Sequence, residues 1–194
     1  MKGQRRRLRA QRAALPAATV AENSRRIASR LWRESALARS RDIACYWAMD
    51  GEVDCMPIID EALARGRRIW LPVIQGEILL FSRWAPGIAL VANRHGIPEP
   101  DTSATQTRRA SRLDVVLTPL VAFDRSGTRL GMGGGFYDRT LRALAQRGAW
   151  RRPLVIGLAH AFQQVDHAPR QAWDIPMHAA VTERAVHHFT AADR

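Results

Sequence analysis

The sequence is poor in several features that mark specialised classes of protein. Its two cysteines, Cys45 and Cys55, form no C-x-x-C pair and no Cys/His cluster at zinc-ligand spacing, which argues against a disulfide framework and a zinc domain. No apolar run approaches the roughly 20 residues that a membrane-spanning helix needs. The basic N-terminus is not followed by the apolar segment of a secretory signal. We therefore expect a cytoplasmic protein with reduced, packed thiols and no membrane partner.

Acidic residues are also scarce. Aspartate and glutamate total 18 against 30 lysines and arginines, so the formal net charge is +12. The first 12 residues contain Lys2 and five arginines and no acidic residue. This balance favours anionic partners such as nucleic acid, anionic lipid, nucleotides or polycarboxylates. A solvated, arginine-rich surface is the alternative interpretation, and no zinc-finger or aromatic RNA-binding motif accompanies the charge.

The order of apolar segments predicts the fold class. Residues 1–37 show helical spacing, with Pro16 opening a second helix after Leu15. Strands are predicted at 43–47, 68–74, 77–81, 113–121, 154–159 and 179–182, helices at 53–65 and 136–147, and a surface loop at 101–112. Strands that alternate with helices predict an α/β fold. We expect one layered domain over residues 1–194, with a mostly parallel central sheet flanked by helices and the 1–37 helical segment packed on it.

Residues 129–139 are the most informative segment, because four glycines lie within five positions between Arg129 and Arg139. Glycine lacks a Cβ, so its backbone N–H groups can approach an anion closely. The segment is not a P-loop, since no Gly-Lys-Ser/Thr follows, and not a dinucleotide fingerprint, since Phe136 replaces the third glycine. It follows a buried strand, after whose carboxyl end ligands bind in open α/β sheets. A nucleotide phosphate site and a tight strand-to-helix turn are the two interpretations.

Several segments together resemble the 5-formyltetrahydrofolate cyclo-ligase family. The most specific are residues 114–124 and the glycine loop 129–139. Glu52-Val53-Asp54, residues 96–100, and residues 173–176 followed by Thr182-Glu183 are similar to other family segments in order and spacing. The resemblance extends over nearly the whole chain.

The resemblance implies an enzyme with ATP as co-substrate and Mg²⁺ as cofactor, which converts 5-formyltetrahydrofolate to 5,10-methenyltetrahydrofolate. It implies that the ATP phosphates lie against Arg129, Leu130, Gly131, Met132, Gly133, Gly134, Gly135, Phe136 and Tyr137. It implies that the folate lies against Trp47, Glu52, Met132, Gly133, Gly134, Gly135 and Phe136. It implies that Mg²⁺ is held by Asp138 and Asp174. The ordinary alternatives are a first-turn helix residue for Asp138, a loop aspartate for Asp174 and a core side chain for Trp47.

The chain departs from the family pattern in two places. The first helix of the family usually carries Lys-x-x-Leu-Arg on the ATP phosphates; here the arginine falls on Arg5, Gln4 replaces the leucine, and Lys2 is one position from the lysine. Residues 5–9 (Arg-Arg-Arg-Leu-Arg) offer a second register with arginine in place of the lysine. Many members also carry a lysine in the glycine loop, where this chain has Gly134. A cation for the γ-phosphate is then expected from Arg129, Arg139 or the N-terminal basic residues.

A basic nucleic-acid-binding protein is the alternative from a different class. Its support is the net charge and the N-terminal arginines. A cyclo-ligase accounts for the same charge, because ATP is a polyanion and cellular folates often carry polyglutamate tails.

Overall fold

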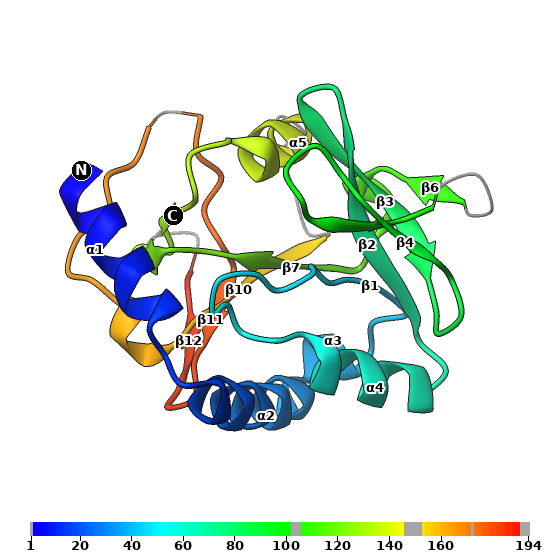
Figure 1. Ribbon diagram of the computed structural model, residues 1–194, viewed down its shortest axis with the longest axis horizontal. Coiled ribbons are helices and arrows are strands. Elements are labelled where there is room, and N and C mark those ends of the chain that lie inside the picture. Colours follow the sequence, from blue (N-terminus) through cyan, green and yellow to red (C-terminus); the bar gives the residue numbers. More distant parts are fainter. Residues whose placement is uncertain (1, 102–105, 146–152, 172, 191–194) are drawn as a thin grey trace.

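A central sheet lies between two layers of helices in the computed structural model of the chain (Figure 1). The structure describes residues 2–101, 106–145, 153–171 and 173–190. Helices α2 (Ala17–Arg33), α3 (Ser35–Ala38) and α4 (Met56–Ala64) cover one face, and α5 (Phe136–Ala145) covers the other. Helix α1 (Lys2–Ala13) stands at the end of the sheet (Figure 1). Short 3-10 helices span Ala110–Arg112 and Ala161–Gln163.

The main sheet has the strand order β12-β11-β10-β7-β1-β2-β3-β6. Its strands are β1 (Asp42–Ala44), β2 (Arg68–Gln75), β3 (Ile78–Trp84), β6 (Thr107–Arg108), β7 (Val115–Pro119), β10 (Leu154–Leu158), β11 (Ala179–Val181) and β12 (Val186–His188). The five neighbours from β11 to β2 are parallel, and the outer strands join antiparallel. Two small antiparallel ribbons, β4 (Leu90–Ala92) with β5 (Pro98–Pro100) and β8 (Ala122–Phe123) with β9 (Arg129–Leu130), lie beside it.

Strand β7 shows why the centre of the sheet is continuously apolar. Successive side chains point to opposite faces, so Val115 and Leu117 enter the core under α2 and α4, and Val116 enters the core under α5. All three are fully buried, as expected for a parallel strand covered on both faces. No helix in the described part of the chain is long and apolar enough to cross a membrane.

The structure confirms the predicted α/β class with its mostly parallel sheet and N-terminal helices. The helix predicted from Val53 begins at Met56, because the Asp54 side chain accepts the Met56 N–H (2.9 Å) and holds the preceding residues in a turn. The loop predicted over 101–112 is wrong in part, since Thr107–Arg108 pairs with β3 and Ala110 is buried. Residues 102–105 of that loop and 146–147 of the last predicted helix lie outside the described residues.

The carboxyl ends of β1, β7 and β10 bring three loops together beside α1. The guanidinium of Arg12 in α1 donates to Leu120 O after β7 (3.1 Å), and the His160 ring after β10 contacts Gly51 O after β1 (3.0 Å). Leu8 of α1 packs in a small cluster with Val121, the residue that follows Leu120. The loops that carry the predicted site therefore share one edge of the sheet.

Candidate active site

The chain between β7 and α5 is fixed at its start by Asp124. This buried carboxylate accepts the N–H groups of Ser126 (2.9 Å), Thr128 (3.2 Å) and Ala168 (2.8 Å). Gly127 closes the turn at φ +76°, where a Cβ would lie 2.8 Å from the Phe189 ring. The turn between β8 and β9 is thus rigid, and Arg129 and the glycines leave it in a defined direction.

The glycine loop has a backbone conformation that only glycine adopts readily, and it is held from outside. Gly133 (φ +110°) and Gly135 (φ +65°) adopt positive φ, which costs side-chain-bearing residues energy. The Arg139 guanidinium donates to Gly134 O (2.7 Å) and to Glu77 O in the neighbouring strand connection (2.7 Å). Arg139 therefore fixes the loop to the edge of the sheet.

The loop presents an anion site made of backbone. Within the described part of the chain, no backbone N–H from Gly131 to Asp138 donates a hydrogen bond to a protein group. The last of these N–H groups belong to the first turn of α5, where the helix dipole adds positive potential. Unpaired N–H groups around a glycine loop that opens a helix suit phosphate oxygens.

A basic cavity of about 380 Å³ lies on one side of the loop. It is lined by Arg5, Arg129, Gly131, Gly133, Gly135, Asp138, Arg139, Arg142, Gln171, Trp173 and Asp174. The buried Arg129 donates to Ile175 O (2.6 Å) and to Asp138 Oδ1 (2.5 Å). Burial lowers the pKa of Arg129 against the attraction of Asp138, and burial raises the pKa of Asp138 although Arg129 opposes the shift.

The carboxylates of this cavity fit a magnesium ion that is also held by a nucleotide. Asp138 and Asp174 line the same cavity, and the negative charge of Asp174 adds to the rise that burial causes in the pKa of Asp138. Asp138 Oδ2 has no hydrogen-bond partner among the described residues. The described ranges contain no group of three or more acidic, histidine or cysteine side chains that could hold a metal, so these two carboxylates would need further ligands. One or two carboxylates with phosphates and water are the usual Mg²⁺ ligands at phosphate sites.

An apolar cavity of about 440 Å³ lies on the other side of the loop. Trp47, Met132, Phe136 and Tyr137 supply much of its wall, and Glu52 supplies a carboxylate. The buried Tyr137 hydroxyl has no hydrogen-bond partner among the residues that the structure describes, so it is available to a ligand. Burial raises the pKa of Tyr137 well above its ordinary value, which keeps the phenol protonated. Flat apolar walls with a few polar groups are typical of a site for a heteroaromatic ligand.

Arg5 reaches the loop from α1. A Cβ placed on Gly133 would lie 3.4 Å from Arg5 Nη1, so the guanidinium packs on the loop at that glycine. Its Nε is buried, and no described residue forms a hydrogen bond with it. Because Arg129 and Arg139 donate to protein groups, Arg5 is the arginine with a buried donor left for a ligand beside the loop.

The structure brings most of the predicted site residues to one place. Arg5, Arg129, Gly131, Gly133, Gly135, Asp138 and Asp174 line the basic cavity, and Trp47, Glu52, Arg129, Gly131, Met132, Gly134, Gly135, Phe136, Tyr137 and Asp138 line the apolar one. The Leu130 side chain lines neither and packs in the cluster with Leu8. The Lys2 side chain lies outside what the structure describes.

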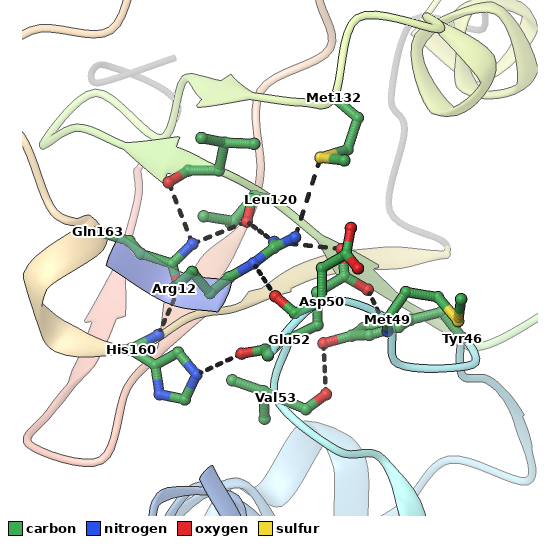
Figure 2. A network of polar contacts seen from close by, with 12 residues as sticks. Arg12, Tyr46, Met49, Asp50, Glu52, Val53, Leu120, Met132, His160 and Gln163 are labelled. Atoms are coloured by element: carbon green, nitrogen blue, oxygen red, sulfur yellow. Dashed lines mark hydrogen bonds and ion pairs between the residues drawn. The ribbon is translucent and has the colours of Figure 1, made fainter. Parts of the chain in front are cut away.

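Sequence reasoning missed Arg12, Tyr46 and the β4–β5 ribbon as parts of the apolar cavity. From the ribbon, His95 lies edge-on to Phe136 (6.0 Å between ring centroids), and Glu99 accepts the Ile74 N–H (3.0 Å). The spacing of Arg12 could have revealed it, because a residue four positions after Leu8 lies on the same face of a helix. An arginine on the apolar face of a helix needs a buried partner. That partner is Glu52, 3.2 Å away (Figure 2).

Fold and site define an α/β protein with a cleft of two compartments, separated by a glycine loop at the carboxyl ends of its parallel strands. The chain belongs to the 5-formyltetrahydrofolate cyclo-ligase family, whose model matches residues 2–183. It is therefore an enzyme of a ligase family.

The similarity to individual relatives extends over most of the chain. The 5-formyltetrahydrofolate cyclo-ligase of Escherichia coli K12 is 39% identical over 182 residues, which cover 92% of this chain and 98% of the relative. That of Haemophilus influenzae is 37% identical over 142 residues, 72% of this chain and 74% of the relative. The solved 5,10-methenyltetrahydrofolate synthetase of Aquifex aeolicus superposes with a TM-score of 0.82 at 31% identity, over 96% of this chain and 91% of that one.

Proposed function

We propose that the protein catalyses the ATP- and Mg²⁺-dependent conversion of 5-formyltetrahydrofolate to 5,10-methenyltetrahydrofolate, with release of ADP and phosphate. Family membership and the names of the relatives support the folate reaction. The observation that supports an ATP-dependent reaction is the wall that the two cavities share. Arg129, Gly131, Gly135 and Asp138 line both the basic and the apolar cavity. A phosphoryl donor in one compartment would thus meet an acceptor in the other at the loop.

The proposed chemistry needs two steps. The formyl oxygen attacks the γ-phosphorus and ADP leaves, which converts a poor leaving group into an imidate-like phosphate. N10 then attacks the formyl carbon, N10 loses its proton, and phosphate departs with the former formyl oxygen as the ring closes. Such a reaction depends on positioning and charge stabilisation and needs no side-chain nucleophile.

Each role falls to residues of this chain. The N–H groups of the loop would hold phosphate oxygens, and Arg5 would supply the cation that many relatives place at the position of Gly134. Trp47 and Phe136 would pack on the flat pterin, and Glu52 would accept N–H groups from its edge. Asp138 and Asp174 would hold Mg²⁺, which when bound would neutralise part of the phosphate charge.

Purified protein tests the proposal directly. With 5-formyltetrahydrofolate, ATP and Mg²⁺ we expect the absorbance of the methenyl product to appear together with one ADP for each product. Omission of ATP or chelation of Mg²⁺ should stop it. Absence of methenyl product from folded protein under these conditions would falsify the proposed function.

A separate variant tests the assignment of Asp138 as a Mg²⁺ ligand. Asp138→Asn should lower turnover by on the order of a hundredfold or more, because a neutral amide is a poor Mg²⁺ ligand. Since this change also removes the negative charge beside buried Arg129, Asp174→Asn serves as a second variant, with a raised Mg²⁺ requirement as its readout. Wild-type turnover and Mg²⁺ dependence in both variants would contradict the assignment.

A further inference from the structure

Arg12 is a fully buried arginine that the proposed chemistry does not use. Only 1% of it is exposed, and all three guanidinium nitrogens have partners. Nε donates to Asp50 O (3.1 Å) and Nη1 to Leu120 O (3.1 Å), while Nη2 lies 3.9 Å from the Met132 sulfur. Nη1 is also 3.2 Å from Glu52 Oε1 (Figure 2). One side chain therefore connects α1 to the loop after β1, to the end of β7 and to the glycine loop.

Glu52 depends on this contact for its charge. It is 9% exposed, and its second oxygen accepts the Met49 N–H (3.1 Å). Burial raises the pKa of Glu52, Asp50 raises it further, and Arg12 opposes both. The other titratable groups that face it are the phenols of Tyr46 and Tyr137, whose pKa values burial raises, so both are neutral. Within the ranges that the structure describes, Arg12 is the cation that forms an ion pair with Glu52.

The turn that carries Glu52 is pressed against α1 and held from behind. A Cβ on Gly51 (φ +71°) would lie 2.3 Å from Arg12 O, so only glycine allows this approach. The His160 ring donates from Nε2 to Gly51 O (3.0 Å), and Asn23 donates to its Nδ1 (3.0 Å). Burial lowers the pKa of His160, which keeps this neutral arrangement. Arg12 and Glu52 thus meet in a fixed geometry and not through two mobile side chains.

We propose that Arg12 is a positioning residue for the folate: it keeps Glu52 ionised in a desolvated pocket and aims its carboxylate at the apolar cavity, where it accepts N–H groups from the edge of the pterin ring. The proposal rests on the proposed function for the identity of the ligand. An ionised carboxylate is an acceptor at both oxygens, whereas a protonated one presents a donor to a ring edge that itself donates. Loss of the Arg12 charge therefore weakens folate binding even where the fold survives.

The charge of Glu52 can be measured without substrate. The chain has seven glutamates, so ¹³C-labelled glutamate gives a small set of carboxyl resonances that Glu52→Gln assigns. In Arg12→Gln we expect the titration midpoint of Glu52 to rise by about 1 to 3 pH units, the usual influence of an opposite charge at this distance. Arg12→Lys should return it toward the wild-type value. Arg68→Gln, which removes an arginine from Asp42 at the other end of the strands, should leave it unchanged.

Kinetics distinguish a positioning role of Arg12 from a purely structural one, because a purely structural defect would not shift the pH profile. In Arg12→Gln the acid limb of the pH profile for kcat/KM, measured with the folate as the varied substrate, should shift upward with the Glu52 midpoint, and activity should recover as the pH is raised. The KM for ATP should change little. An unshifted Glu52 midpoint, or a loss that is equal at every pH and for both substrates, overturns the proposal.

A folding control keeps the proposal testable if Arg12→Gln is unstable. The folded-state pKa of Glu52 lies above its ordinary value, so the stability that protonation provides is present at low pH and lost as the pH rises through the folded-state pKa. Arg12→Gln should then be more destabilised at about pH 7 than at about pH 4, and adding Glu52→Gln should restore stability at pH 7. Equal instability of the single and double variants at both pH values overturns the role. If wild-type protein forms no methenyl product, the proposed function fails while the carboxyl titration still decides the Arg12–Glu52 coupling.

Discussion

At the residue scale, three of the arginines that line the basic cavity make different contacts. Arg129 is buried and holds Asp138 and Ile175 O, and Arg139 holds the backbone of Gly134 and Glu77. Arg5 packs on Gly133 and has a buried Nε without a partner in the described part of the chain. Because Arg129 and Arg139 are held by protein groups, the phosphate-side cation would come from α1 and not from the loop.

Arg5→Ala should therefore raise the KM for ATP by about tenfold to a hundredfold, the usual loss for a charge-assisted hydrogen bond, and leave the KM for folate near the wild-type value. The matched control is Arg7→Ala, which removes the same charge from the same helix at an exposed position that lines none of the cavities on this face. Steady-state kinetics with each substrate varied would measure both. Equal increases in the two variants would show general attraction by the basic helix and contradict a specific contact.

At the element scale, the glycine loop works as a rigid partition because its shape is determined by three neighbours. The Asp124 turn fixes where it starts, Arg139 fixes its middle, and α5 fixes its end. Helix α5 is itself tied to the sheet, since Thr140 Oγ1 accepts the Leu79 N–H of β3 (2.8 Å). A loop supported in this way can keep unpaired N–H groups aimed at a ligand without collapsing onto itself.

Gly135→Ala tests this rigidity against a matched glycine. A Cβ at Gly135 would lie 2.7 Å from Arg139 Nη1, so the guanidinium must shift from its position on the loop, whereas Gly66 has nearly the same φ (+67°) and open space around it. Both substitutions should cost about 1 to 2 kcal/mol of stability through positive φ. Only Gly135→Ala should lower kcat/KM for ATP, by on the order of tenfold to a hundredfold. Thermal unfolding and kinetics on both variants separate the effects; equal kinetics would contradict the role of Arg139.

The sequence predicts elements better than it predicts contacts between them. The glycine loop could be found because a local motif carries it, and the resemblance to a family added Asp138, Trp47 and Glu52 as predicted site residues. The α/β class follows from alternating apolar runs. The partners of Arg12 lie 38, 40, 108 and 120 positions away in the chain, and local periodicity says nothing about such pairs. The β4–β5 ribbon was missed because its strands are three residues long and half exposed.

At the scale of the whole molecule, the net charge of +12 serves a cleft whose proposed substrates are both anions. The arginines of α1 and of the glycine loop concentrate positive charge on the face where the cavities open. A basic surface of this kind raises the local concentration of polyanions and increases association rates at low salt.

Raising the salt concentration from about 0.05 to about 0.5 M should raise the KM for both ATP and folate with little change in kcat, since screening weakens attraction and not chemistry. The same charge is the support for nucleic-acid binding. We expect mixed-sequence RNA to bind weakly at about 0.15 M salt, with an affinity poorer than micromolar. Tighter binding that falls steeply with salt would favour the nucleic-acid alternative.

Helix α1 carries Arg5 and Arg12 seven residues apart, with Leu8 packed between them on the same face. Seven residues of helix span about 10 Å, so one rigid rod reaches both compartments of the cleft. Any shift of this rod that brings Arg5 closer to a phosphate also moves the group that holds Glu52. The proposed occupants of the cleft would then influence each other's affinity through the helix, and thermodynamic linkage would make that influence equal in both directions.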